Sequence, residues 1–185
     1  MIRTLGRLLT FRLSREDFES FDHRHLLLGL AFTWLAGIGR YWDHPNAKVL
    51  QYLGVGSLIY VVCLSALLWL VITPLKPERW SFRHLLTFIS LTSPPALLYS
   101  IPVERFFDLE TARTMNVGFL AVVATWRVAL LLFYLNRHAG LRMAPVAVAS
   151  LLPIAFIIIS LAMRNLQHVV VDVMGGLGGP GSAHD

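Results

Sequence analysis

Arg127 lies near the middle of the apolar stretch Met115–Tyr134 and is the residue of this sequence best suited to chemistry. A stretch of twenty residues, at about 1.5 Å per residue, can cross a hydrocarbon core of roughly 30 Å. A guanidinium inside such a span costs roughly 2.5–3.5 kcal/mol on insertion scales, so it normally faces protein or water. Arg127 therefore predicts either a site for an anionic lipid headgroup or solute, or a structural arginine satisfied inside a helix bundle.

A buried partner for Arg127 is expected, and Tyr99 and the backbone near Pro94 and Pro95 are candidates. Proline has no backbone N–H, so the Ser93-Pro94-Pro95 run should bend or break its helix. In lipid, such a break is tolerated only where neighbouring groups satisfy the freed carbonyls. The prolines favour a structural kink. The alternative is a discontinuous helix that lines a ligand-binding site, to which we assign Arg127, Tyr99, Pro94 and Pro95.

Three carboxylates, Glu104, Asp108 and Glu110, fall in one predicted loop and could work as an acid–base pair. Arg105 and Arg113 lie beside them in the sequence, which favours ion pairs on a surface loop instead. The loop therefore supplies no catalytic residue to the prediction.

The histidines flank the apolar runs singly, without the i, i+4 spacing of a helical zinc site, and Cys63 is the single cysteine. The basic residues are scattered at the ends of apolar runs, as in membrane anchoring, and do not form a phosphate-binding face. The sequence therefore predicts a non-enzymatic protein with no metal site, no cofactor and no nucleic-acid partner.

Two rows of small residues with four-residue spacing indicate close helix packing. The first row is Gly29, Thr33 and Gly37, and the second is Ala121, Thr125 and Ala129. Residues four apart share one helix face, and small side chains there let helix backbones approach closely in a membrane. The rows predict where helices touch without naming the partner helix.

The composition points to a membrane, because 56% of the residues are apolar and 15% are charged, against about 25% charged in soluble domains. The apolar runs predict an all-α polytopic bundle of five spans, at residues 26–42, 49–72, 82–101, 115–134 and 143–163. The third and fifth spans contain Pro94-Pro95 and Pro153, so both should be kinked.

Residues 1–25 form a basic segment ahead of the first span. Apolar residues recur in it at helical spacing, at Ile2, Leu5, Leu9 and Leu13. This pattern predicts a short helix on an anionic membrane surface. Ser14 and Asp17 have the spacing of a capping box, which predicts that a second helix starts there. Residues 164–185 are a Gly-rich tail.

The distribution of Lys and Arg predicts an orientation. With five spans, ten of these residues fall on the N-terminal side and five on the other. The positive-inside rule then places the N-terminus in the cytoplasm and the C-terminal tail outside, as in a multi-pass protein of a bacterial inner membrane. The expected partners are membrane lipids and other membrane helices, in a homo-oligomer or a membrane complex.

The stretches SFRHLLTFISLTSPPALLYSIP (Ser81–Pro102) and TWRVALLLFYLNRHAGLRMAPVAVASLLPI (Thr125–Ile154) resemble the Yip1-like family of five-span membrane proteins. The resemblance covers roughly the last three spans. It implies five spans with a cytoplasmic N-terminus and assigns no catalytic residue.

Two functional hypotheses follow from these residues. The first is an assembly or accessory subunit that acts through helix–helix contacts at the two small-residue rows. The second is a small transporter or lipid-binding protein with a polar site at Arg127 and the Pro94-Pro95 break. An intramembrane enzyme would need a buried carboxylate or histidine facing Arg127.

Overall fold

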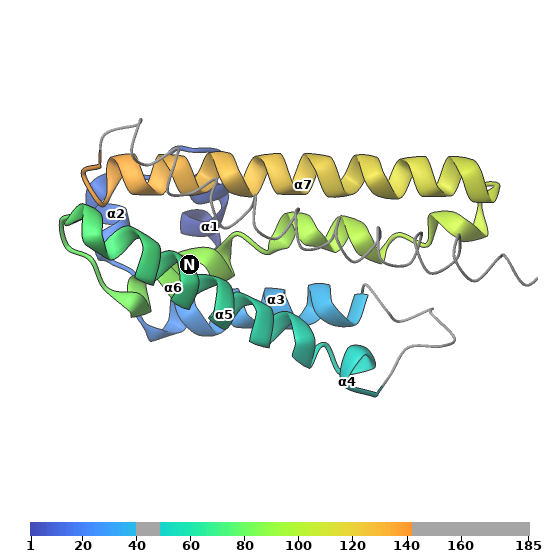
Figure 1. Cartoon of the computed structure of the whole chain (residues 1–185), viewed down its shortest axis with the longest axis horizontal. Coiled ribbons are helices and arrows are strands. Elements are labelled where there is room, and N and C mark those ends of the chain that lie inside the picture. The colour runs from blue at the N-terminus through green and yellow to red at the C-terminus, as the bar shows by residue number, and fades with distance from the viewer. Residues whose placement is uncertain (40–48, 142–185) are drawn as a thin grey trace, which may run out of the picture. The chain divides into compact units, whose positions relative to one another are not determined.

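The computed structural model describes residues 1–39 and 49–141, and every regular element in these ranges is a helix (Figure 1). The predicted all-α class is therefore confirmed for this part of the chain. The end of the predicted first span, the fifth span at 143–163 and the tail at 164–185 lie outside the described residues. The described helices belong to one compact unit, Met1–Ser150.

The α-helices are α1 (Ile2–Leu9), α2 (Arg15–Glu19), α3 (His23–Gly39), α4 (Val49–Tyr52), α5 (Val55–Ile72), α6 (Phe82–Leu91) and α7 (Leu109–Arg137). Short 3-10 helices lie at η1 (Thr73–Leu75), η2 (Pro94–Ser100) and η3 (Val103–Arg105). Helices α3, α5 and α6 pack against one another, and α7 packs against η2 and η3.

Two helical stretches are long and apolar enough to cross a membrane, Val55–Leu75 and Glu110–Arg137. Together they cover most of the predicted second and fourth spans. Helix α6 is apolar but has only 10 residues. The described residues thus support two candidate spans by length and composition, and the five-span arrangement stays a prediction.

The predicted second span, 49–72, is not one helix, because the chain breaks at Gly54 between α4 and α5. Gly54 has a φ of +66°, a left-handed conformation that glycine adopts without steric strain. A Cβ at this position would lie 2.8 Å from the backbone oxygen of Trp34 on α3. Gly54 therefore combines a turn with a close approach of two backbones, which the apolar pattern alone could not show.

The predicted third span, 82–101, changes helix type at its prolines. Helix α6 ends at Leu91, and the chain continues from Pro94 as the 3-10 helix η2. Pro94 cannot donate to the carbonyl of Ser90, and the N–H of Ser93 donates to it instead over 3.1 Å. The prolines are predicted to bend or break the helix, and the structure shows a break, so one kinked α-helix over 82–101 is wrong.

Helix α7 starts at Leu109, six residues before the predicted start of the fourth span. Asp108 caps it by accepting a hydrogen bond from the backbone N–H of Thr111 over 3.0 Å. This bond also lowers the pKa of the Asp108 carboxyl. The prediction of a polar loop up to Thr114 is therefore wrong in its second half, because polar residues form the first turns of the helix.

The capping box predicted at Ser14 is confirmed at the start of α2. The backbone N–H of Ser14 donates to the Asp17 carboxylate over 2.8 Å, and the N–H of Asp17 donates to the Ser14 hydroxyl over 3.2 Å. The first of these bonds is the largest cause of the lowered pKa of Asp17. The box starts α2 so that Phe18 is fully buried in the core.

The apolar stripe of residues 1–13 faces the protein rather than a membrane surface. Leu5 and Leu13 are buried in the main hydrophobic core, whereas Ile2 is 81% exposed. The backbone oxygen of Leu9 accepts a hydrogen bond of 3.1 Å from the indole N–H of Trp126 on α7. The predicted membrane-surface helix is wrong for Leu5 and Leu13, because they pack against the chain's own bundle.

Candidate functional site

Arg127 shares its face of α7 with Leu131 and Tyr134, which are both buried in the core. Its Nε donates a hydrogen bond of 3.3 Å to the hydroxyl of Thr92, which follows α6. The Thr92 hydroxyl in turn donates to the carbonyl of Ile89 over 2.7 Å. The proton of Thr92 is thereby committed to Ile89, which leaves an oxygen lone pair for the guanidinium.

The guanidinium of Arg127 is only partly satisfied. Its Nη2 atom is buried and has no hydrogen-bond partner among the described residues. Tyr60 on α5 and Tyr99 on η2 are close enough to interact with it electrostatically. No carboxylate pairs with Arg127 within residues 1–39 and 49–141. A positive charge is therefore held inside the bundle beside neutral hydroxyl groups.

Further hydroxyl groups lie near the end of α6, and we refer to Thr33, Ser90, Thr92 and Ser93 as the hydroxyl cluster. The Oγ atoms of Thr33 and Ser93 are 2.7 Å apart, and Thr33 also donates to the carbonyl of Gly29. The Oγ of Ser90 is buried without a partner in the described structure. The cluster gives the interior of an apolar bundle a local concentration of polar atoms.

The structure thus brings together most of the predicted ligand site. Arg127 and Tyr99 are electrostatic neighbours, and the prolines act through the backbone. Pro94 and Pro95 end α6, which makes Thr92 its C-terminal cap and places the Thr92 hydroxyl beside Arg127. Sequence reasoning missed Thr92 as the direct partner of Arg127, although it named the proline break next to it.

Other segments of the same chain pack against the first small-residue row. A Cβ on Gly29 would lie 2.7 Å from the Cβ of Ser90 on α6, and one on Gly37 would lie 2.6 Å from the hydroxyl of Ser57 on α5. Thr33, between the two glycines, contacts Ser93. The partner of this row is therefore the chain's own α5 and α6, together with the residues after α6.

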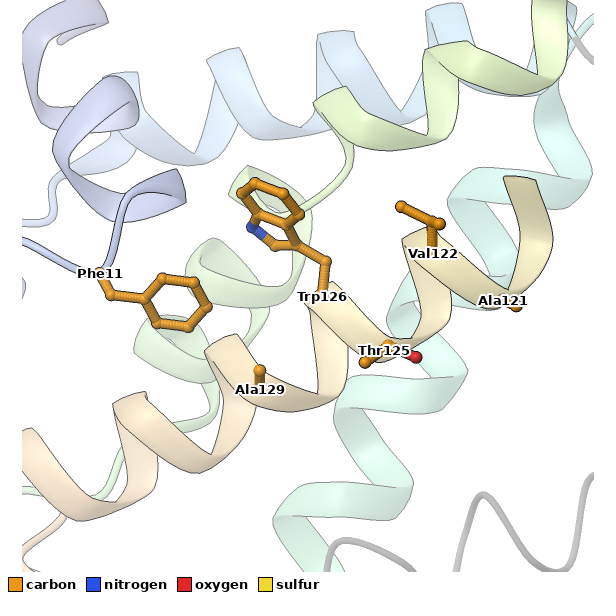
Figure 2. A pocket seen from close by; sticks show the side chains of 6 residues that line it. All are labelled: Phe11, Ala121, Val122, Thr125, Trp126 and Ala129. Carbon is orange, nitrogen blue, oxygen red and sulfur yellow. The ribbon is translucent and has the colours of Figure 1, made fainter. Parts of the chain in front are cut away.

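The second small-residue row is open within the described structure. Ala121, Thr125 and Ala129 line an apolar groove of about 440 Å³, together with Val122, Trp126 and Phe11. Figure 2 shows that Phe11 reaches the groove from the turn after α1, while the other five side chains come from α7. Ala121 and Thr125 are exposed, so no described helix covers this face.

The remaining sequence candidates do not form a site in the described ranges. Asp108 caps α7 and Glu110 lies in its first turn, so these two carboxylates serve or flank a helix start. The Glu104 side chain lies outside what the structure describes. Cys63 is exposed on α5. Within residues 1–39 and 49–141, no three His, Cys, Asp or Glu side chains gather around a common point.

Sequence reasoning also missed a buried aromatic cluster at the C-terminal end of α7. The ring of His138 lies 5.1 Å from Tyr134, 5.7 Å from Phe18 and 5.8 Å from His84, measured between centroids. Tyr134 is also stacked on Phe88 at 4.2 Å. The i, i+4 spacing of Tyr134 and His138 was the available signal, but their partners come from distant parts of the chain.

Comparison with protein-family models, curated proteins and solved structures gives no match to this chain. The resemblance of its last three predicted spans to the Yip1-like family is not tested by these comparisons and stays a prediction.

Proposed function

We propose that this chain is an integral membrane protein that binds an anionic group at Arg127, inside its helix bundle. Large apolar side chains on the two candidate spans support the membrane location. Ile59 and Leu70 on α5 are 57% and 65% exposed, and Val117 on α7 is 60% exposed. Apolar side chains exposed along helices long enough to span a bilayer are expected where the surrounding solvent is lipid.

The full proposal includes five spans with a cytoplasmic N-terminus. Its support is the charge distribution, because Lys and Arg are twice as frequent on the N-terminal side of the five predicted spans. In this arrangement α5 and α7 are the second and fourth spans. Arg127 then lies at the depth of the hydrocarbon core, where a charge without a partner is most unfavourable.

The observation that carries the proposal is the buried, unpartnered Nη2 atom of Arg127. A buried cation without a counter-charge is strongly destabilising, and an anion that accepts hydrogen bonds from the guanidinium relieves this. The bond from Nε to Thr92 fixes the orientation of the guanidinium plane and leaves Nη2 for a ligand. The hydroxyl groups of Tyr60 and Tyr99, which interact electrostatically with Arg127, are of the type that donates to oxyanions.

A single arginine with a buried Nη2 atom suits a ligand group that carries one negative charge. The phosphodiester of a lipid headgroup that has no cationic group of its own and the carboxylate of a small solute both carry one net negative charge and accept hydrogen bonds through oxygen. Because the chemistry is shared, the two sources must be separated by experiment.

The test is thermal unfolding of the full chain in a mild detergent, with phosphatidylglycerol, phosphatidylcholine or acetate added in turn. Ligand binding at 100 times Kd stabilises the folded state by about 2.7 kcal/mol. We expect phosphatidylglycerol or acetate to raise the Tm of the natural sequence, and phosphatidylcholine to leave it unchanged. Stabilisation by acetate alone identifies a solute site, and stabilisation by phosphatidylglycerol alone identifies a lipid site.

Three variants make the test specific. Arg127→Leu should lose the ligand-dependent rise in Tm, while Arg127→Lys should keep part of it through charge alone. Arg137→Leu removes an exposed arginine from the last turn of the same helix and should keep the full rise. Equal stabilisation of all four proteins by phosphatidylglycerol would show that the lipid acts on the basic surface and not at Arg127.

The stability of Arg127→Leu without ligand separates binding from structure. Replacing a buried, incompletely paired charge by an apolar side chain is often neutral or stabilising, because the desolvation penalty disappears. We expect unfolding of the ligand-free variant at an unchanged or higher Tm. A large loss of stability would instead make Arg127 a structural arginine.

Assembly with a second copy of the chain is the competing proposal, and the open groove on α7 favours it. Ala121, Thr125 and Ala129 have the spacing that lets two membrane helices cross closely, and no described residue occupies their face. The occupant would be α7 of the second copy. The first small-residue row gives this proposal no support, because its contacts are internal.

A further inference from the structure

Residues 1–21 are held in the bundle by buried apolar side chains, by the hydrogen bond from Trp126 to Leu9 and by two ion pairs, with a third ion pair inside the segment. The Phe18 ring lies 5.3 Å from Tyr134 and 5.7 Å from His138, both at the C-terminal end of α7. The ion pairs are Arg7–Asp17 within this segment, and Arg15–Glu78 and Arg79–Glu19 between α2 and the turn before α6. Phe18 and Leu8 are the fully buried side chains of this segment.

His138 forms part of the wall around Phe18 and cannot accept a charge there. It is completely buried, and both ring nitrogens lack a hydrogen-bond partner among the described residues. The Nδ1 atom of His84, on the neighbouring ring, is also buried without a partner. Only the backbone of Arg79 favours a proton on His138, and burial outweighs this contact, whereas two neutral rings pack without charge.

The charged groups around the pair make protonation still less favourable. They are Arg15 and Glu19 on α2, Glu78 and Arg79 in the turn before α6, and Arg83 beside His84 on α6. The two carboxylates are already paired, Glu78 with Arg15 and Glu19 with Arg79. The groups that act on His138 electrostatically, Arg15, Arg79 and His84, all disfavour a positive charge on it.

We propose that His84 and His138 form a proton-sensitive latch, whose protonation releases residues 1–21 from the bundle. The charged imidazolium of His138 is stabilised by hydration. Water reaches the ring only when the Phe18 side chain, which packs over it, moves away. The latch does not depend on the anion site at Arg127, because none of its groups contacts that residue.

The released segment would stay tethered at Asp22. The Asp22 carboxylate lies 2.7 Å from Nδ1 of His25 at the start of α3. Hydrogen bonding from the backbone N–H of His25 lowers the pKa of Asp22 to about 2, so Asp22 keeps its charge at pH 5.

The pH range follows from His138. Burial is the main cause that lowers its pKa from 6.5 to about 4, whereas the released segment leaves the imidazole in water with its ordinary value. Between pH 4 and pH 6.5, His138 is protonated in the released state and neutral in the packed state. The packed state therefore becomes less stable, relative to the released state, as the pH falls from 6.5 to 4. From pH 7.5 to pH 5 the equilibrium shifts roughly 25-fold towards release.

The experiment measures the distance between two spin labels on the full chain in detergent. The labels are attached to Arg3→Cys on α1 and Val117→Cys on α7, both exposed positions, in a Cys63→Ser background. We expect one narrow distance distribution at pH 7.5 and a growing, longer and broader component at pH 5. An unchanged distribution at pH 5 would overturn the proposal.

Two variants test the role of the pair. His138→Phe keeps an aromatic ring that cannot be protonated, so the narrow distribution should persist at pH 5. His23→Gln changes an exposed histidine at the start of α3 and should respond to pH as the natural sequence does. If His138→Phe does not fold, His84→Gln replaces it and should weaken the response. Release at pH 5 that persists in every folded histidine variant would refute the latch.

Discussion

The two small-residue rows have the same spacing and opposite surroundings. Gly29 and Gly37 on α3 are buried, and any side chain added to them would collide with α5 or α6. Ala121 and Thr125 on α7 are exposed and line an open groove. Small residues with four-residue spacing therefore show that a second helix can pack closely against this face. The rest of the fold decides whether that second helix comes from the same chain.

The two rows also differ in the polarity of their surroundings. The row on α3 is joined to its neighbours by hydroxyl contacts, from Thr33 to Ser93, whereas the groove on α7 is apolar apart from Thr125. A polar contact inside an apolar bundle fixes the register of two helices, because shifting one of them leaves buried polar atoms unpaired. The row on α7 carries no such fixed register within the described residues.

The largest expected loss of stability is for a glycine-to-leucine substitution in the first small-residue row. Gly37→Leu places a side chain against the Ser57 hydroxyl and the Gly54 backbone oxygen, which a Cβ alone would approach to 2.6 Å and 2.9 Å. Overpacking against backbone cannot be relieved cheaply, so we expect a loss of roughly 3 kcal/mol or more. Denaturant unfolding in detergent measures it.

Gly118→Ala is the matched control for this variant. Gly118 lies inside α7, and a Cβ there meets nothing within 4 Å. Alanine should raise the free energy of unfolding slightly, by about 0.5–1 kcal/mol, because it reduces the freedom of the unfolded chain. Similar stability for Gly37→Leu and Gly118→Ala would show that the row on α3 is not closely packed.

An intermediate effect is expected for Thr33→Val. Valine has nearly the same shape, but it removes the hydroxyl that contacts Ser93 and leaves the buried Ser93 Oγ without that partner. We expect a loss of about 1–2 kcal/mol in the same unfolding measurement. Thr33→Ser keeps the hydroxyl and should recover most of the loss, so equal destabilisation by valine and serine would point to packing instead.

The smallest effect on stability is expected for Thr125→Leu in the open groove. Thr125 is exposed in the open groove, so the free energy of unfolding should change by less than about 0.5 kcal/mol. The informative measurement is the mass of the protein in detergent. A dimer that becomes a monomer on this substitution supports assembly through α7, and a natural sequence that is already monomeric excludes that proposal.

Features fixed by a few neighbouring residues could be predicted from the sequence. The capping box at Ser14 and the helix break at Pro94 are of this type, because each depends on backbone donors within one turn of the chain. The start of α7 was placed too late because hydropathy marks only the apolar part of a helix. The cap at Asp108 was the local signal for its true beginning.

Features that depend on distant contacts could not be predicted in the same way. Arg127 was identified from its position in an apolar stretch, but its bond to Thr92 depends on how α6 and α7 pack. The break at Gly54 depends on the nearby backbone of α3. The stripe of Leu5 and Leu13 shows an apolar face equally suited to lipid or protein, and only the fold distinguishes the two.

The burial of Phe18 has a consequence for how the chain is made. Synthesis proceeds from the N-terminus, so α2 leaves the ribosome long before α6 and α7 exist. Until then Phe18 lacks Phe88, Phe133, Tyr134 and His138, which are the rings that surround it in the finished protein. Phe18 thus reaches its final place only after α7 has been made, and a nascent chain that stops before α7 cannot bury it.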